Sequence, residues 1–183
     1  MNFVPTSIKD LVVVEPKVFL DQRGCFFENY NQRQFGKNGV NVNFVQDNHS
    51  ESTKNVLRGL HCQLGLHAQA KLVRVLVGEI LDVAVDARIE SPSFGKWFSI
   101  KLSAENKKQL FVPRGFLHGF LVLSDSCVVN YKCDNLYNSQ AECTVRWDDV
   151  DLQIDWQLFG HDVIVSDKDQ QGVAFKDAFA YRG

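Results

Sequence analysis

Short apolar runs separated by turn residues constrain the fold of this chain more than any other feature. Each run is too short for a typical helix and is rich in Val, Phe or Leu, which favour strands. Several short strands at this spacing are typical of an all-β sandwich or barrel. The runs are Leu11–Val14, Phe26–Tyr30, Val42–Val45, Lys71–Val77, Ile80–Val85, Trp97–Leu102, Leu110–Val112, Gly119–Leu123, Cys127–Cys133 and Cys143–Trp147.

Helical signals occur in only two places. The segment Asn31–Lys37 begins with an N-cap residue and ends near Gly36 or Gly39, and the tail beyond Ser166 carries a weaker signal. No linker, internal repeat or low-complexity tract interrupts the chain. Since 183 residues suit one domain, we expect a single domain over residues 1–183 with short peripheral helices.

Charge and cysteine content narrow the class of protein. A net charge of −2 gives no basis for binding nucleic acid or an anionic membrane. No apolar stretch is long enough to span a bilayer, and the first ten residues lack the regions of a signal peptide. The five cysteines form no CxxC pair, which favours reduced thiols. We therefore expect a cytoplasmic protein.

Strand periodicity points three polar side chains toward the interior of the barrel. Lys71 has the same parity as the valines of Lys71–Val77. Tyr131 alternates in the same way with the apolar residues of Cys127–Cys133. His118 shares a face with the apolar residues two and four positions after it.

One inward tyrosine or histidine is usually a core residue, but lysine is almost never buried without a partner. Polar groups cost free energy in a dry core, and an eight-stranded barrel has room for one small ligand. The three side chains together therefore indicate a polar cavity.

Two motifs are more specific. Pro113–Gly119 reads PRGFLHG and contains the PxGxxHG pattern of cupins, and Leu57–Gln63 reads LRGLHCQ. With further segments in matching order and spacing, the chain from about Leu11 to about Asp169 closely resembles the dTDP-4-dehydrorhamnose 3,5-epimerase family. The further segments are Asp21–Gly24, Phe44–Ser50, Ala70–Arg74 and Tyr131–Lys132.

The resemblance implies a homodimeric cupin jelly roll with N-terminal strand exchange, which inverts C3 and C5 of a dTDP-4-keto-6-deoxyhexose in dTDP-L-rhamnose biosynthesis. It implies that His61 is the general base, that Asp169 orients it and that Tyr131 is the general acid. Lys71 and His118 match polar groups around the sugar. The residues that match nucleotide, diphosphate or sugar contacts are Arg23, Glu28, Gln46, Asn48, Arg58, Glu142 and Lys168, of which the first two reach into the neighbouring subunit's site.

These residue types suit that chemistry independently of the resemblance. A 4-ketone acidifies both neighbouring C–H bonds, and an enolate that is reprotonated from the opposite face gives the inverted centre. The reaction needs a base, an acid on the other face and a donor for the oxyanion. Imidazole serves as a base near neutral pH, a carboxylate fixes its tautomer, and a lysine ammonium suits the enolate oxygen. Because nothing is oxidised overall, we expect neither a redox cofactor nor a metal, and no GxGxxG or GxxxxGK[ST] motif occurs.

Arginine forks match phosphate oxygens, so Arg58 and Arg23 are the expected diphosphate ligands. Strict alternation places Arg58 and His61 on opposite faces of a strand. Because both belong in the site, we predict a β-bulge or break near Gly59. Cys62 has the opposite parity to His61, which favours a packed thiol.

His67 is the main departure from the family pattern. With His61, Gln63 and His118 it could imitate the metal ligands of other cupins, which keeps a metal-dependent cupin enzyme as an alternative. We expect His67 to face solvent in a loop that contains Gly65.

Two smaller departures concern recognition of the nucleotide and the residue that orients the catalytic base. Leu136 lies where relatives often carry an aromatic residue, and the tail after Asp169 differs from the family's usual sequence. His49 and His161 are expected in loops.

Two further alternatives remain. An epimerase that inverts a single centre of a related nucleotide-linked 4-keto sugar would use the same base and acid. A non-catalytic sugar-binding cupin would bind substrate without proton exchange, but it needs neither a base nor an acid.

Overall fold

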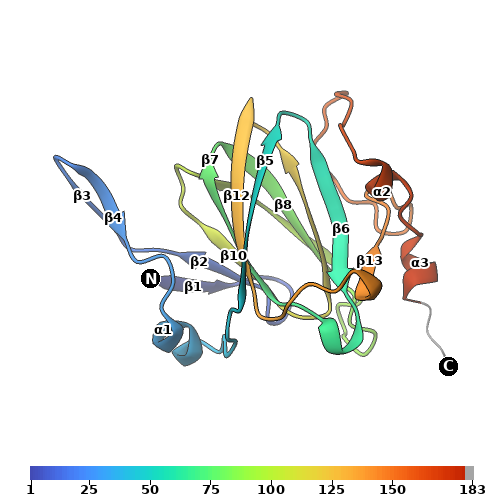
Figure 1. The fold of residues 1–183 in the computed structure, drawn as a ribbon, viewed down its shortest axis with the longest axis horizontal. Helices are drawn as coiled ribbons and strands as arrows, with labels where there is room; N and C mark the ends of the chain where they lie inside the picture. Colours follow the sequence, from blue (N-terminus) through green and yellow to red (C-terminus); the bar gives the residue numbers. More distant parts are fainter. Residues whose placement is uncertain (180–183) are drawn as a thin grey trace.

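The computed structural model describes residues 1–179 and consists mainly of two antiparallel sheets with short helices at their edges (Figure 1). One sheet has six strands in the order β1-β2-β10-β7-β12-β5, and the other has five in the order β13-β6-β11-β8-β9. Buried side chains from both sheets form one apolar cluster between them. This is the all-β architecture that the strand pattern predicts, and the two packed sheets agree with the jelly roll that the resemblance implies.

The six-stranded sheet contains β1 (Asn2–Pro5), β2 (Val12–Glu15), β5 (Gln46–Thr53), β7 (Lys71–Val77), β10 (Gln109–Val112) and β12 (Ser126–Cys133). The five-stranded sheet contains β6 (Leu57–Gln63), β8 (Glu79–Asp86), β9 (Trp97–Ser103), β11 (Phe116–Val122) and β13 (Glu142–Thr144). A separate hairpin comprises β3 (Val18–Asp21) and β4 (Gly24–Phe27). The helical turns are α1 (Gln32–Lys37), η1 (Gly65–His67), η2 (Ser139–Ala141), α2 (Asp167–Gln170) and α3 (Phe175–Ala178).

The predicted inward faces of β7, β11 and β12 are largely confirmed. Val73 and Val129 are buried between the sheets, and Tyr131 packs against the same cluster. Val77 is exposed, so its predicted inward position was wrong. The pairing of β7 with β12 shifts register next to Val77, and such a bulge interrupts the regular alternation of a strand.

The first helix begins as predicted, because the Asn31 side chain accepts a hydrogen bond from the backbone N–H of Gln34. Phe35 buries its ring in a cluster on the outer face of the six-stranded sheet. The predicted strand Val42–Val45 was wrong. Val42 instead packs into that outer cluster, and the next strand is the polar β5, which begins at Gln46, directly after Val45.

The hairpin β3–β4 projects away from the two sheets (Figure 1). Its second strand, β4, begins and ends earlier than the predicted strand Phe26–Tyr30. Its side chains Phe19, Leu20 and Phe26 are 52%, 80% and 71% exposed. Large apolar side chains gathered on a projecting edge are typical of protein–protein interaction surfaces.

Residues after β13 cover the outer face of the five-stranded sheet. Trp156 and Phe175 are buried there with the outward side chains of β6, β8 and β11. Short helices do form in this tail, as α2 and α3, and α2 lies next to β6. Within residues 1–179, no helix is long and apolar enough to cross a membrane.

Candidate active site

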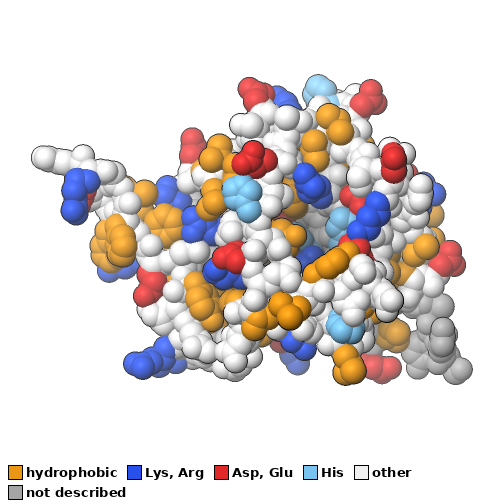
Figure 2. All heavy atoms as spheres, viewed as in Figure 1, with side chains coloured by type: hydrophobic (Ala, Val, Ile, Leu, Met, Phe, Trp, Pro, Cys, Tyr) orange, Lys and Arg blue, Asp and Glu red, His pale blue; other side chains and the backbone are white. Residues whose placement is uncertain are grey.

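A cavity of about 310 Å³ lies between the two sheets and brings together most of the predicted site residues. Figure 2 shows histidine and basic side chains around a hollow between β5 and β6. The cavity is lined by Ser50, Arg58, His61, Lys71, His118, Phe120, Tyr131, Glu142, Ser166, Lys168 and Asp169. A small adjoining hollow of about 90 Å³ shares four of these residues and adds Gln46, Asn48, Gln69 and Tyr137 among its walls.

A bulge in β6 turns Arg58 and His61 to the same cavity, as predicted. His61 pairs with His118 and Arg58 pairs with Phe120, so two residues of β6 oppose one residue of β11 between these pairs. The two strands are in close contact there, since a Cβ on Gly59 would lie 2.6 Å from the Cα of Gly119. Glycine also suits the φ of +118° at this position.

His61 and Asp169 form a hydrogen-bonded pair at one side of the cavity. The Nε2 of His61 lies 2.5 Å from Oδ1 of Asp169, and the Gly59 N–H donates to Oδ2 at 3.2 Å. Burial raises the pKa of the Asp169 carboxyl, but the hydrogen bonds from His61 and Gly59 outweigh it, so the pKa is lowered overall. The geometry leaves Nδ1 of His61 as the nitrogen available to a ligand.

Replacing Asp169 with asparagine is expected to lower the free energy of unfolding by about 1–3 kcal/mol at neutral pH, because a charged, buried acceptor is lost. A carboxyl whose pKa is lowered by folding stabilises the fold above its unfolded pKa, and the stabilisation is lost as the pH falls through the folded pKa. The difference between the wild type and Asp169→Asn in urea unfolding should therefore narrow in acid.

The matched control is Asp167→Asn, which changes an exposed carboxyl on the same short helix. This control should unfold like the wild type throughout the pH range. A difference for Asp169→Asn that stays constant from neutral pH into acid would contradict the assignment.

Lys71 and Tyr131 extend into the cavity from the six-stranded sheet. The Lys71 Nζ lies 5.8 Å from the centroid of the Tyr131 ring, and within residues 1–179 the ammonium has no salt-bridge partner. Burial lowers the pKa of Lys71, against the opposing effect of nearby thiols and carboxyls. Burial likewise raises the pKa of the Tyr131 phenol, so the phenol keeps its proton at neutral pH.

His118 belongs to a second histidine–carboxylate pair, which the sequence reasoning missed. Its Nε2 lies 2.7 Å from Oδ1 of Asp82 on β8, and both side chains are buried. Asp82 alternates with the inward-facing Ile80 and Ala84, so a carboxylate at this parity of an apolar strand was the available signal.

Polar contacts organise the rim of the cavity. Lys168 bonds to one Glu142 oxygen at 2.5 Å, and the Tyr137 hydroxyl donates to the other at 2.8 Å. Burial raises the pKa of Glu142, but these two hydrogen bonds outweigh it and the net shift is downward. Gln46 donates to Asn48 and accepts from the Tyr137 backbone N–H. Tyr137 was missed, and it supplies an aromatic ring directly after the exposed Leu136.

Arg23 and Glu28 are not brought to the cavity of their own subunit. Arg23 lies in the β3–β4 turn, where its guanidinium pairs with Asp21. Glu28 follows the hairpin and accepts hydrogen bonds from Asn31 and Gln34. Both residues belong to the exposed segment that projects from the sheets.

The other three histidines lie at the surface and not in the cavity. His67 is exposed in η1 and bonds to Asn138, so it does not join His61 and His118. Among residues 1–179, no three His, Cys, Asp or Glu side chains converge where a metal ion could be held. His161 is in a loop as expected, but His49 is an exposed residue of β5, so its predicted loop position was wrong.

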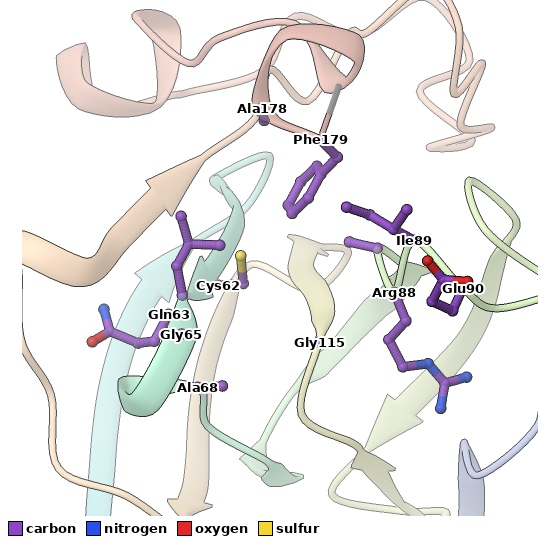
Figure 3. A pocket seen from close by; sticks show the side chains of 12 residues that line it. Cys62, Gln63, Gly65, Ala68, Arg88, Ile89, Glu90, Gly115, Ala178 and Phe179 are labelled. Carbon is purple, nitrogen blue, oxygen red and sulfur yellow. The ribbon is translucent and has the colours of Figure 1, made fainter. Parts of the chain in front are cut away.

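A larger hollow of about 700 Å³ lies on the other side of β6 (Figure 3). Cys62 and Phe179 face this space, together with Ile89. The buried Cys62 thiol packs with the outer cluster, as its parity predicts. Among residues 1–179, no histidine, tyrosine or lysine lines this hollow, so the smaller cavity carries the acid–base groups.

The cavity holds the groups that proton transfer requires. His61 lies on the five-stranded sheet, whereas Tyr131 and Lys71 lie on the six-stranded sheet. A flat ring between the sheets would therefore meet a base on one side and a weak acid on the other. Arg58 and Lys168 add positive charge at the rim.

Comparisons with known proteins agree on one family. The family model described as dTDP-4-dehydrorhamnose 3,5-epimerase matches residues 5–177. The enzyme of that name from Shigella flexneri is 52% identical over 179 residues, which cover 97% of this chain and 98% of the relative. The crystal structure of the same kind of enzyme from Elizabethkingia anophelis NUHP1 is 54% identical, covers 98% of both chains and has a TM-score of 0.94. A Legionella pneumophila Philadelphia 1 structure in complex with dTDP-4-keto-L-rhamnose is 44% identical over 96% of this chain and 93% of the other, with a TM-score of 0.92.

Proposed function

The chain belongs to the dTDP-4-dehydrorhamnose 3,5-epimerase family, and from this premise we propose which of its residues invert the two carbons beside the ketone. It is an epimerase of dTDP-L-rhamnose biosynthesis that acts on a dTDP-linked 4-keto-6-deoxyhexose. The observation that carries the proposal is the single cavity that His61, Lys71, Tyr131 and Asp169 line together.

His61 is the base that removes the proton beside the ketone. Its Nε2 is held by Asp169, so Nδ1 takes the proton, and the carboxylate stabilises the imidazolium that forms. The same nitrogen serves C3 and C5 when the sugar ring presents each carbon in turn. Asp169 thus acts on the substrate only through His61.

Tyr131 returns a proton to the opposite face of the ring. Burial raises the pKa of its phenol, which therefore stays neutral until the carbanion needs a proton. The Lys71 ammonium lines the same cavity and stabilises the oxygen that becomes negative in the enolate. His118 contributes as an imidazolium, because its Nε2 is bonded to Asp82 and only a protonated Nδ1 can donate to that oxygen.

The nucleotide diphosphate is held at the rim of the cavity. Arg58 offers a guanidinium beside Lys168, and both suit phosphate oxygens. Gln46, Asn48 and Glu142 form the polar wall of the adjoining hollow and would contact the sugar or base.

Arg23 and Glu28 complete the site of the second subunit in a homodimer. The exposed apolar side chains of the β3–β4 hairpin support this assignment, since they would be covered by the neighbouring subunit. Exchange of this hairpin would place the Arg23 guanidinium beside the other subunit's phosphate-binding groups.

The Arg23→Ala variant should lose about 10- to 100-fold in substrate affinity, because a charged hydrogen bond to phosphate is removed. Mixing it with a His61→Ala variant should restore activity at low substrate concentration, since one site of each mixed dimer is then complete. The matched control is a mixture of His61→Ala and Tyr131→Phe, whose mixed dimers contain no complete site. Activity in the first mixture that equals only the sum of its parts would contradict an exchanged hairpin.

The reaction is tested by incubating the protein with dTDP-4-keto-6-deoxyglucose in D₂O and following the sugar by NMR. Deuterium should enter at both C3 and C5, and the L-configured product should appear. Label at one carbon alone would indicate a single-centre epimerase, and no label would overturn the mechanism.

We also propose that the enzyme works in the cytoplasm without a metal or redox cofactor. All five cysteines are free thiols, and the reaction involves no net oxidation. A stoichiometric metal whose removal by EDTA abolishes activity would overturn the cofactor proposal.

A further inference from the structure

Asp82 is a carboxylate in the middle of β8 with an unusual environment. Its side chain is fully buried among the apolar residues between the sheets. Oδ1 bonds to Nε2 of His118 at 2.7 Å, whereas Oδ2 has no hydrogen-bond partner within residues 1–179. A buried carboxylate with one unpaired oxygen destabilises a fold, so its presence calls for a functional explanation.

Asp86 on the same strand provides the contrast. Its carboxylate is also fully buried, but it accepts hydrogen bonds from Arg88, Ser91 and Ser93. That arrangement explains Asp86 as a structural residue. No comparable set of donors surrounds Asp82, so hydrogen bonding alone does not account for its position.

Asp82 lies behind two groups that line the catalytic cavity. His118 is hydrogen-bonded directly to Asp82. The negative charge of Asp82 raises the pKa of Lys71, whereas burial lowers it. His61 lies on the neighbouring strand β6, where it is the register partner of His118. The other titratable groups around the Lys71 ammonium are Cys62 on β6, Tyr131 and Cys133 on β12, and Glu142 on β13.

These neighbours do not replace Asp82. The thiols are neutral at physiological pH, since burial raises the pKa of Cys133 to about 11 and the hydrogen bond with Cys143 raises that of Cys62 far above its usual range. The charge of Glu142 is already paired with Lys168. Asp82 is therefore the carboxylate whose charge is available to Lys71 and His118.

We infer that Asp82 is a positioning residue, which accepts the hydrogen bond from Nε2 of His118, stabilises the imidazolium form that can donate from Nδ1, and keeps the Lys71 ammonium charged. This inference rests on the proposed function, because both groups then face the oxygen that becomes negative as the ketone enolises. Asp82 does not touch the substrate. It provides the fixed negative charge that keeps a cation beside the enolate in a site where burial favours loss of that cation's proton.

The test is the near-isosteric Asp82→Asn variant. Its kcat for deuterium exchange should fall by about 10²-fold, comparable to the loss of one oxyanion donor. Without the carboxylate, Lys71 loses its proton at lower pH, so the alkaline limb of the kcat profile should move to lower pH. An alkaline limb that stays where the wild type has it would overturn the role toward Lys71.

Asp86→Asn is the matched control, because it neutralises an equally buried carboxylate on the same strand. It should lower stability without moving the alkaline limb. A general effect of losing a buried charge would move both profiles equally, and that outcome would also overturn the inference.

A second measurement needs no variant. In ¹⁵N NMR of the wild-type protein, Nε2 of His118 should carry a proton, because the Asp82 carboxylate accepts it; an unprotonated Nε2 would overturn the role toward His118 even if Asp82→Asn fails to fold. Failure of the proposed function is recognised separately, since a wild type that exchanges no deuterium fails before Asp82 is considered.

Discussion

Replacing His61 with alanine is expected to abolish deuterium exchange at both C3 and C5 and to lower kcat by about 10³-fold or more. Asp169 holds His61 with Nδ1 open to the cavity, whereas His118, the neighbour of His61 on β11, is paired with Asp82. Binding of dTDP, measured by calorimetry, should change little, because Arg58 and Lys168 stay in place. Added imidazole should restore part of the exchange by occupying the space that the ring leaves.

His67→Ala is the control for this experiment, since it removes an exposed imidazole only a short distance along the chain. It should exchange deuterium at the wild-type rate. If His61→Ala retains exchange, the base is another group. If His67→Ala loses activity together with a bound metal, the alternative of a metal-dependent cupin is favoured.

Replacing Tyr131 with phenylalanine is expected to separate proton removal from inversion. The His61–Asp169 pair remains, so the substrate still loses its protons to solvent. Inversion should fall by about 10²-fold, because no acid remains on the far face of the ring. NMR in D₂O measures both rates in one sample, as label in the starting isomer and label in the product.

The control is Tyr30→Phe, which removes a tyrosine hydroxyl from the outer aromatic cluster. It should leave both rates unchanged. Equal rates for Tyr131→Phe and the wild type would reduce Tyr131 to a core residue. Loss of exchange together with inversion would instead assign the phenol to proton removal.

The sequence predicted the sheet and the centre of the site because both depend on periodicity. Lys71 and Tyr131 interrupt apolar strands at inward positions. Arg58 and His61 had to share a face, and their spacing allows this only with a bulge near Gly59. The inward positions of Lys71 and Tyr131 follow from the alternation of one strand. The resemblance placed Arg58, His61 and Asp169 in the site, and the bulge was inferred from that requirement.

The strand β5 escaped prediction for a physical reason. Its sequence, QDNHSEST, contains no apolar residue, because its inner face borders the polar cavity and it lies at the sheet edge. A pattern search for apolar strands cannot find a strand that contains no apolar residue. The same chemistry that identifies the site thus hid one of its walls.

The roles of Asp82 and of the hairpin residues could not be predicted from periodicity, because they depend on contacts between distant parts of the chain or between chains. The pairing of Asp82 with His118 depends on neighbouring strands that are 36 residues apart in the chain. The proposed role of Arg23 depends on a second subunit, which one chain's periodicity does not describe. Only the resemblance suggested that Arg23 leaves its own subunit, and the projecting hairpin is compatible with that proposal.

The additional residue in β6 has a consequence for how this scaffold can evolve. Arg58 and His61 are three residues apart, which in a regular strand would place them on opposite faces, and they share the cavity only because the bulge absorbs one of the residues between them. Substitutions in the walls can reshape the substrate range one side chain at a time. A further residue inserted between Arg58 and His61 would instead turn the imidazole away from the cavity, and loss of Gly59 would remove an N–H that donates to Asp169. New specificities on this framework are therefore reached by exchanging side chains while the length of this segment stays fixed.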